Sequence, residues 1–466
     1  MTTQVYDVVV IGAGAAGENA ADYAIRRSRR TALLVEPALV GGECSYYACM
    51  PSKALLRPLE VRATAQQLGG LPDRLPLDVS ALLARRDYWV AGYDDSGQAE
   101  WAAGAGIDLA RGTARLAGER TVAVTAPDGD REVTARHAVV VATGSRPVIP
   151  ELFAATHPWT SRDATAIVEV PESIAVVGGG VVAAEAAQWL AGLGSRVTLL
   201  VRGDRLLQRL EPFAAELVAD GLRAAGVEVR FGADVSAAAR AGAAGTGLGR
   251  LHGGRVSLTV DGTTHDFAEV LVATGRRPAT DDLGLETIGL TPDGFGDPAR
   301  RPDWLYAVGD ASGEPALTHW GKYRARLVGE RIGALAEGRP APQVPTDVPV
   351  PQVVFTDPQV SSVGLTEAGA RSAGLAVDCV EVPMSSASGY GLLRDEAPGR
   401  AKLVFAASDG PLLGATFAGT EVAELVHAAT VAVVGGLTAA TLWHAVPSYP
   451  TSSEVWLRLL EAYRDR

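Results

Sequence analysis

The chain alternates short, continuous apolar runs with alanine-rich stretches. Residues 5–11 and 31–36 are apolar and rich in β-branched side chains, which is typical of parallel strands that are buried on both faces. The alanine-rich residues between these two runs favour a helix. The same order returns between residues 174 and 201. The pattern therefore predicts two β-α-β units with parallel strands.

Glycines fill the turn after the first predicted strand, in the run Gly12-Ala13-Gly14-Ala15-Ala16-Gly17. They permit a tight turn and a close approach of the backbone to a ligand, and the helix that follows directs its N-terminus at a pyrophosphate. The second strand ends at Glu36, whose carboxylate can accept hydrogen bonds from ribose hydroxyls. We predict a dinucleotide site at Gly12, Gly14, Gly17 and Glu36.

The second β-α-β unit has a similar glycine turn, but its second strand is followed by a different residue. Gly178 and Gly180 correspond to the first two glycines, and Ala183 takes the place of the third, which the motif tolerates. Arg202 lies 24 positions after Gly178, as Glu36 lies 24 after Gly12. A guanidinium binds a 2′-phosphate that a carboxylate would repel. The second site is therefore expected to prefer NADPH, with NADH possible.

Two of the three cysteines, Cys44 and Cys49, are separated by four residues. A close thiol pair suits two-electron redox chemistry or metal binding, but no histidines group near it as a zinc site would require. Residues five apart in an ideal helix have Cα atoms roughly 8.6 Å apart, beyond the limit of about 7 Å for a disulfide. We expect Cys44 to lie at an irregular helix entry, after Gly41 and Gly42 and before Pro51.

Composition narrows the class of protein. A chain of 466 residues with 47% hydrophobic content is long enough for about three domains. No apolar run approaches the ~20 residues of a membrane span, so no membrane association is expected. A net charge of −12 makes nucleic acid an improbable partner. The N-terminus leaves no room for a signal peptide, and we expect a cytoplasmic protein.

Further motifs carry a resemblance to a known family. They are Ala142-Thr143-Gly144-Ser145-Arg146-Pro147, Ala273-Thr274-Gly275-Arg276-Arg277-Pro278, Leu305-Tyr306-Ala307-Val308-Gly309-Asp310 and the run 354–366. Over essentially its full length the chain resembles the class I pyridine nucleotide-disulfide oxidoreductases, which include dihydrolipoamide dehydrogenase, glutathione reductase and mercuric reductase.

The resemblance implies an α/β fold with two Rossmann-like dinucleotide-binding domains, for FAD and NAD(P), and a C-terminal α+β dimerisation domain. It implies an FAD-binding domain over residues 1–148 and 279–346, an NAD(P)H-binding domain over 149–278 and an interface domain over 347–466. It also implies a homodimer whose active site is shared between subunits.

The resemblance assigns roles to individual residues. Cys49 exchanges electrons with the flavin and Cys44 faces the acceptor, while Lys53 lies beside flavin N5 and pairs with Glu185. Further cofactor-binding residues are Gly42, Thr143, Gly144 and Asp310 for FAD, and Gly275 for the nicotinamide cofactor. Cys379, in an apparent strand of the third domain, is expected to be inert.

The chain departs from the family near its end. The family carries a His-Pro-Thr-x-x-Glu run in which the histidine is the acid and base for thiol exchange and the glutamate orients it across the dimer. Here the run starts at Tyr449 and ends at Glu454. A phenol titrates near ~10 and an imidazole near ~6.5, so Tyr449 is a poor base at neutral pH. His444 is a less favoured substitute.

We therefore expect an FAD-dependent, NADPH-preferring oxidoreductase that passes electrons to a Cys44–Cys49 disulfide and on to a disulfide or a related small two-electron acceptor. A quinone or dye reductase that uses the flavin directly stays open, as does a dihydrolipoamide dehydrogenase-type subunit of a larger complex. Mercury reduction is less favoured, because the chain has no adjacent cysteine pair. No resident metal is expected.

Overall fold

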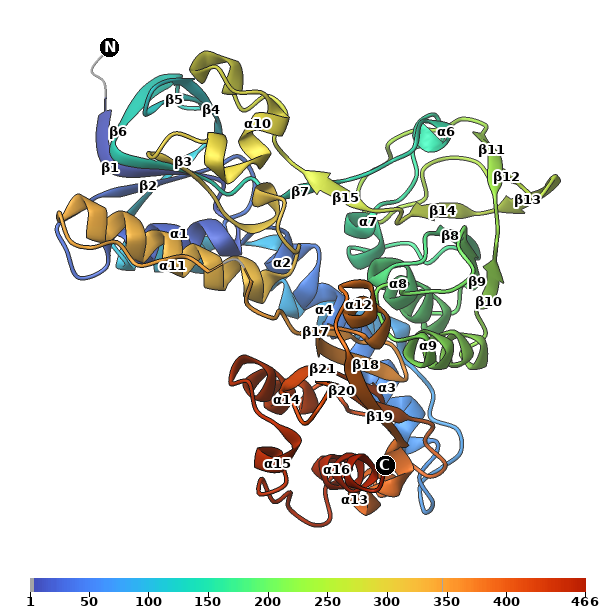
Figure 1. Cartoon of the computed structure of the whole chain (residues 1–466). Coiled ribbons are helices and arrows are strands. Elements are labelled where there is room, and N and C mark those ends of the chain that lie inside the picture. Colours follow the sequence, from blue (N-terminus) through green and yellow to red (C-terminus); the bar gives the residue numbers. More distant parts are fainter. Residues whose placement is uncertain (1–3, 346) are drawn as a thin grey trace. The chain divides into compact units, whose positions relative to one another are not determined.

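A computed structural model describes residues 4–345 and 347–466 (Figure 1). The chain forms two compact units. The first contains the chain up to Pro51, Asp87–Val148 and the segment that begins at Arg276. The second contains Ser52–Arg86, Ile149–Gly275 and Asp347–Arg466.

The first unit is built on a mainly parallel sheet in the order β3-β2-β1-β6-β5-β4, with β16 also paired to β6. The two central parallel pairs come from the apolar runs, as in the register Val8↔Ala32. Alternate side chains face opposite sides, so that Val8 and Val10 lie in a different apolar cluster from Val9 and Ile11. The strands are β1 (Gln4–Ile11), β2 (Ala32–Glu36), β3 (Ile107–Arg111), β4 (Thr113–Gly118), β5 (Thr121–Thr125), β6 (Arg131–Val141) and β16 (Leu305–Ala307), with a separate antiparallel pair of β7 (Ser145–Pro147) and β15 (Arg276–Pro278).

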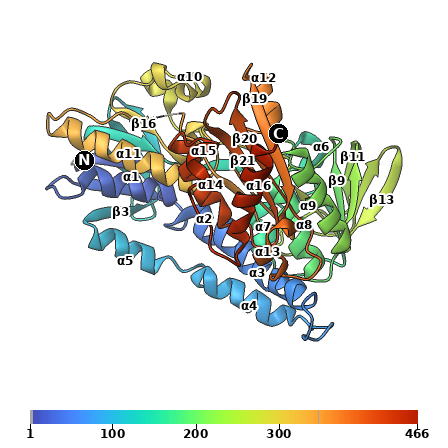
Figure 2. The ribbon, with the colours of Figure 1, turned by 60° about the horizontal axis from the view of Figure 1, so that its bottom comes forward.

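Helices α1 (Ala15–Ile25) and α11 (Thr318–Ala336) lie side by side in the first unit (Figures 1 and 2). Small residues permit this contact: a Cβ at Gly329 would lie 2.7 Å from the Tyr23 Cβ. The close packing fixes the start of α11 relative to the glycine turn before α1. The other helices here are α2 (Gly42–Tyr46), α5 (Ser96–Gly104) and α10 (Pro292–Gly296), with short 3-10 turns η1 (Ala91–Tyr93), η2 (Leu285–Ile288), η3 (Pro298–Arg300) and η4 (Gly309–Ser312).

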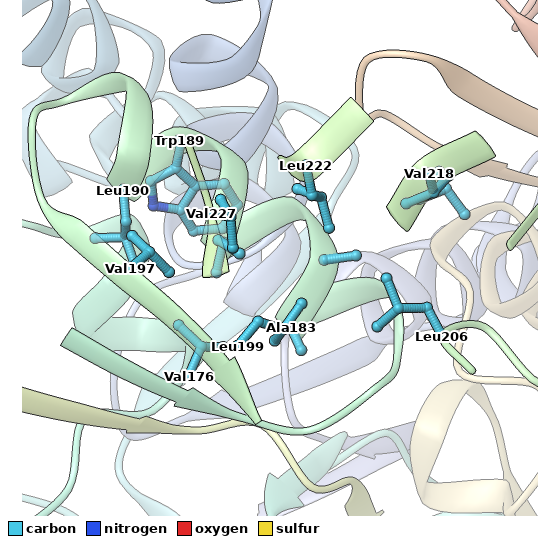
Figure 3. Packing of buried hydrophobic residues seen from close by; sticks show 14 of the residues in the cluster. Val176, Ala183, Trp189, Leu190, Val197, Leu199, Leu206, Val218, Leu222 and Val227 are labelled. Atoms are coloured by element: carbon cyan, nitrogen blue, oxygen red, sulfur yellow. The ribbon is translucent and has the colours of Figure 1, made fainter. Parts of the chain in front are cut away.

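The second unit contains a parallel sheet in the order β10-β9-β8-β14 and an antiparallel sheet in the order β11-β12-β13. Figure 3 shows Leu199 from the parallel sheet beside Ala183 of α8, with Val176, Trp189 of α8 and Leu222 of α9 in the same apolar cluster. The elements are β8 (Ser173–Val177), β9 (Arg196–Val201), β10 (Glu228–Phe231), β11 (Val235–Arg240), β12 (Val256–Val260), β13 (Thr263–Phe267), β14 (Glu269–Val272), α6 (Glu151–Ala154), α7 (Ser161–Thr165), α8 (Val181–Gly192) and α9 (Pro212–Ala224).

A further antiparallel sheet, in the order β17-β18-β21-β20-β19, forms the C-terminal part of the second unit. Helix α14 packs on β18 and β21, and α16 packs on β19 and β20 (Figure 2). The strands are β17 (Gln352–Val354), β18 (Gln359–Gly364), β19 (Val377–Pro383), β20 (Arg400–Ala406) and β21 (Leu412–Gly419), and the helices are α12 (Glu367–Ser372), α13 (Ser388–Gly391), α14 (Leu425–Val434), α15 (Ala439–Leu442) and α16 (Val455–Arg464), with η5 (Met384–Ser386) and η6 (Ser452–Glu454).

Two more helices, α3 (Cys49–Ala65) and α4 (Val79–Trp89), contain residues of both units. The mixed α/β architecture confirms the predicted fold class. No helix within the described ranges combines the length and the apolar character that crossing a bilayer requires.

The alanine- and glycine-rich stretch 236–254 begins inside a strand of the second unit. Residues up to Arg240 belong to strand β11, which pairs with β12. Gly249 approaches Ala166 so closely that a Cβ would lie 2.1 Å from its carbonyl oxygen. Small residues allow both the strand and the close contact here, and cross-strand pairing overrides the weak local preference.

Arg240 and Glu269 form an ion pair whose two side chains are completely buried. Glu269 also accepts hydrogen bonds from the backbone nitrogens of Val270 and His252, at 2.9 and 3.0 Å. Removing the cation leaves a buried carboxylate without its charge partner. We expect Arg240→Met to lower the free energy of unfolding by about 3–5 kcal/mol, measured by chemical denaturation. The double variant Arg240→Met/Glu269→Gln is the control and should recover part of that loss; a fully stable single variant would contradict the argument.

Candidate active site

The two cysteines lie in different helices. Cys44 is in α2, and Cys49 is the first residue of α3. Helix α2 ends at its C-cap residue Tyr47, whose φ of −133° is not helical. The chain therefore leaves the helical conformation between the two cysteines. This confirms that no single regular helix carries the pair. Both residues are thiols in this structure, and their side chains hydrogen bond to each other.

The entry into α2 depends on close backbone contact with the first glycine turn. Gly41 and Gly42 have positive φ values of 104° and 63°. A Cβ at Gly42 would lie 2.7 Å from the Cα of Gly14, and the Gly41 nitrogen donates to the Ala13 carbonyl at 2.8 Å. Glycine is needed at these positions because a side chain would force the two turns apart. The contact places Cys44 beside the start of α1.

Residues of α11 surround the thiols. The Cys49 Sγ and Thr318 Oγ1 atoms are 3.2 Å apart and share a hydrogen bond. The hydrogen bond with Cys49, and then burial, raise the pKa of the Cys44 thiol above its usual range, while Thr318 and Lys322 act in the opposite direction. Cys44 is therefore held as a thiol and must lose a proton before it can attack.

Lys53 and Glu185 are brought together as predicted. The Lys53 Nζ atom lies 2.8 Å from Glu185 Oε2, and only 5% of the Glu185 side chain is exposed. The other oxygen, Oε1, accepts from the backbone nitrogen of Phe355 at 2.9 Å, and the Phe355 ring centroid lies 4.8 Å from Lys53 Nζ. The ammonium is thus fixed one helical turn after Cys49 on α3.

The first dinucleotide turn has the form that an FAD-binding site needs. Gly12 has φ +99°, and a Cβ there would lie 2.5 Å from the Ala142 carbonyl oxygen. A Cβ at Gly17 would lie 2.0 Å from the Gly12 oxygen, and Gly14 is the N-cap of α1. The Glu36 carboxylate accepts from the Ala13 nitrogen at 2.9 Å, which stiffens the turn. The residues present fit a bound dinucleotide.

Residues of the runs 142–147 and 276–278 meet Asp310 of the run 305–310 in the first unit. The Asp310 carboxylate accepts from the Ser145 hydroxyl at 2.5 Å. Thr143 donates through its hydroxyl to the Ala279 carbonyl at 2.7 Å, and Gly144 has φ +73°. Arg276 donates through Nε to the Ser145 hydroxyl at 2.8 Å. This network holds the Asp310 carboxylate in place.

The second dinucleotide turn reproduces the geometry of the first. Gly178 has φ +143°, and a Cβ there would lie 2.3 Å from the Ala273 carbonyl oxygen. Gly180 is the N-cap of α8, and Ala183 is fully buried against the sheet. Arg202 is exposed directly after β9. The remaining predicted contact, Gly275, has φ +140°.

The C-terminal run places its predicted residues in contrasting environments. The Tyr449 side chain is exposed, whereas Glu454 is buried. Glu454 Oε1 pairs with Arg458 at 3.1 Å. His444 is exposed in the loop that precedes Tyr449.

The two tyrosines between the cysteines pack within the first unit. Tyr46 is buried, and its hydroxyl donates a hydrogen bond to the Gln98 Oε1 atom at 3.0 Å. Tyr47 stacks on Tyr93, with ring centroids 5.4 Å apart. These contacts give both rings a packing role within the first unit.

Sequence reasoning missed two residues near the thiols, Thr318 and Lys322 of α11. The sequence analysis assigns them only to the FAD-binding domain, since neither lies in a recognised motif.

Comparison with known proteins decides the family. Residues 6–325 match the sequence profile of the pyridine nucleotide-disulphide oxidoreductases, and residues 350–459 match that family's dimerisation domain. The chain belongs to this family. Its members are flavoprotein oxidoreductases with a redox-active disulfide that bind FAD and a pyridine nucleotide, and the dimerisation domain supports a homodimer.

Relatives within the pyridine nucleotide-disulphide oxidoreductases have several activities. The chain is 34% identical to the dihydrolipoyl dehydrogenase of Chlorobaculum tepidum, covering 96% of this chain and 95% of the relative. It is 30% identical to the mercuric reductase of Staphylococcus aureus, covering 96% of this chain and 81% of the relative. The fold is similar to that of the HOCl-induced flavoprotein disulfide reductase RclA from Escherichia coli, with a TM-score of 0.82 at 23% identity over 99% of both chains.

Proposed function

We propose that this enzyme is an NADPH-dependent flavoprotein reductase that reduces a small-molecule disulfide through Cys44 and Cys49. The observation that carries the proposal is the hydrogen-bonded thiol pair, held at the junction of α2 and α3 against an FAD-type glycine turn. FAD, when bound, supplies the two-electron chemistry between the nicotinamide and the cysteines. The chain itself supplies the thiols, their proton transfers and the fixed charges around them.

In this proposal each predicted domain has its own role. Residues 1–148 and 279–346 bind FAD, residues 149–278 bind NADPH and residues 347–466 form the dimer interface. Tyr449 and Glu454 would then contribute to the partner subunit's site. An exposed Tyr449 is compatible with that role, because its phenol is available to a partner.

Each cysteine has a distinct part in the proposed relay. Cys49, at the first position of α3, lies in the positive end of the helix dipole, which favours its thiolate. Cys44 attacks the acceptor disulfide and forms a mixed disulfide with it. Cys49 then attacks the Cys44 sulfur, re-forms the Cys44–Cys49 bond and releases the second acceptor thiol. Two electrons leave the protein, and the acceptor disulfide becomes two thiols.

The relay is tested by labelling the cysteines after anaerobic reduction with NADPH. Oxidised holoenzyme treated with iodoacetamide should carry no label at Cys44 or Cys49. One equivalent of NADPH should make both residues reactive, so that mass spectrometry of the peptide finds two carbamidomethyl groups. Cys379, which lies outside the relay in β19, serves as the internal reference. Unchanged labelling of the pair after NADPH would refute the proposal.

Cofactor preference is expected to reside in Arg202. Arg202→Glu replaces a phosphate-binding cation with an anion at the end of β9, so the ratio of kcat/KM for NADPH to that for NADH should fall by about 10²-fold or more. Arg196→Glu is the matched control, because this exposed arginine lies at the opposite end of the same strand. Steady-state kinetics with both cofactors give the ratio; an unchanged ratio in Arg202→Glu would exclude NADPH selection at this residue.

A further inference from the structure

Helix α2, which carries Cys44, is too short to hold its place alone. It contains five residues, Gly42–Tyr46, and its N-cap Gly41 has no side chain that could bond the first turn. Isolated helices of this length are unstable in water, because few hydrogen bonds offset the cost of fixing the backbone. The position of the Cys44 thiol therefore depends on the contacts that α2 makes with other segments of the first unit.

One of these contacts is an ion pair between Glu43 and Arg276. Glu43 lies directly before Cys44 in α2, and its Oε2 atom accepts a hydrogen bond from Arg276 Nη2 at 2.5 Å. Only 24% of the Arg276 side chain and 28% of the Glu43 side chain are exposed, so water screens this pair less than a pair on the open surface. The ion pair joins α2 to β15, a strand 233 positions further along the chain in the same unit.

Arg276 is itself fixed by two bonds to Ser145 of β7. Its Nε atom donates to the Ser145 hydroxyl and its Nη2 atom to the Ser145 carbonyl, both at 2.8 Å. Strands β7 and β15 pair in antiparallel fashion, with Arg276 opposite Pro147. A planar guanidinium that donates to three separate acceptors has little freedom to rotate. Arg276 therefore holds Glu43 from a rigid base.

The same network continues to Asp310, a predicted FAD-binding residue. The Ser145 hydroxyl that accepts from Arg276 donates to Asp310 Oδ2 at 2.5 Å. One guanidinium thus connects the helix that carries Cys44 with the 3-10 turn η4 that carries Asp310. Loss of Arg276 would break this connection at its centre.

We propose that Arg276 is a positioning residue for Cys44: its guanidinium holds Glu43, and with it α2, so that the Cys44 thiol stays where it can form a disulfide with Cys49. The proposal rests on the Cys44–Cys49 relay proposed above. In this role Arg276 acts through Glu43 and not by contact with a thiol. Without it α2 opens locally more often, and the effective concentration of Cys44 at Cys49 falls.

The first test measures the reduction potential of the cysteine pair in Arg276→Met holoenzyme. The enzyme is equilibrated with mixtures of reduced and oxidised dithiothreitol, whose oxidised form takes up the two electrons and two protons that the pair releases. Alkylation and mass spectrometry then give the fraction of free thiols. An effective concentration lower by about tenfold makes the disulfide easier to reduce and raises the potential by about 30 mV. Arg277→Met is the matched control, because this neighbouring residue pairs with Asp281 and should leave the potential unchanged.

A double-mutant cycle tests whether Arg276 acts through Glu43. Arg276→Met, Glu43→Ala and the double variant break the same ion pair, so all three should show the same rise in potential. Arg276→Lys keeps a cation within reach of Glu43, and its equilibrium constant should stay within about threefold of wild type. A rise in the double variant equal to the sum of the two single rises would overturn the proposal.

Hydrogen exchange measures the opening of α2 directly. In Arg276→Met holoenzyme, the backbone amides of residues 42–46 should exchange about tenfold faster than in wild type, whereas those of the central strand β1 should not change. Wild-type exchange in α2 together with a wild-type potential would overturn the proposal. FAD content is measured on the same samples; a loss of FAD in Arg276→Met that Glu43→Ala does not share would make the guanidinium a cofactor ligand and would also overturn it.

Turnover separates this proposal from the proposed function. With NADPH, Arg276→Met should reduce a small disulfide about tenfold more slowly than wild type and a dye within about twofold, because the dye does not need Cys44. An equal loss of both activities overturns the positioning role. An enzyme that reduces no disulfide, yet shows the Arg276-dependent potential and hydrogen exchange, overturns the proposed function alone.

Discussion

Cys44→Ser enzyme is expected to lose reduction of small disulfides by about 10³-fold or more, while it continues to pass electrons from NADPH to a quinone or dye. A serine hydroxyl cannot form the mixed disulfide, and Cys49 then has no sulfur to attack. The FAD-type turn and the Lys53–Glu185 pair remain intact in this variant, so chemistry before the cysteines is retained. Parallel assays with a disulfide and with a dye, at one NADPH concentration, measure the separation.

Cys379→Ser is the matched control for this prediction. Cys379 lies in β19 of the second unit, and burial raises the pKa of its thiol to about 11. Such a thiol stays protonated at neutral pH, and its loss should leave both activities unchanged. If Cys44→Ser retained full turnover with the physiological acceptor, the quinone or dye reductase would replace the disulfide reductase as the function. The exposed phenol of Tyr449 in place of the family histidine is the feature that favours this second candidate.

Local sequence patterns predicted the parts of the site that depend on neighbouring residues. A glycine turn between a buried strand and a helix has few alternative conformations, so the roles of Gly12 and Gly178 could be read from spacing. The same holds for the break between Cys44 and Cys49, which followed from helix geometry and from the two preceding glycines. The structure also contains the predicted Lys53–Glu185 ion pair, although only the family resemblance suggested that partnership.

The residues that sequence reasoning missed depend on contacts between distant segments. Thr318 is 269 positions from Cys49, and nothing local to either residue indicates their hydrogen bond. Glu18 has the same difficulty, because an acidic residue in an alanine-rich helix is usually solvated. In the structure the Glu18 Oε1 atom is nevertheless shielded from solvent. Burial, which changes the chemistry of a carboxyl group, is a tertiary property.

The second large effect on turnover is expected from a change in the Lys53–Glu185 ion pair. Lys53→Met should reduce NADPH-dependent turnover by about 10²-fold or more with every acceptor, because it removes the fixed positive charge one turn after Cys49. It should also lower the free energy of unfolding by about 1–3 kcal/mol, since it leaves the Glu185 carboxylate buried without its cation. The stability loss is smaller than for a fully buried pair because 36% of the Lys53 side chain is exposed.

A double variant separates these two consequences. Lys53→Met/Glu185→Gln removes both charges, and the glutamine oxygen can still accept from the Phe355 nitrogen. Chemical denaturation should show stability restored toward wild type, whereas turnover should remain low because the ammonium is still absent. Lys53→Arg keeps a cation and should preserve stability better than activity, since a planar guanidinium does not place its charge at the Nζ position. If the double variant recovered stability and turnover together, Lys53 would act only by supporting the fold around Glu185. If turnover stayed low at restored stability, the charge itself would be required.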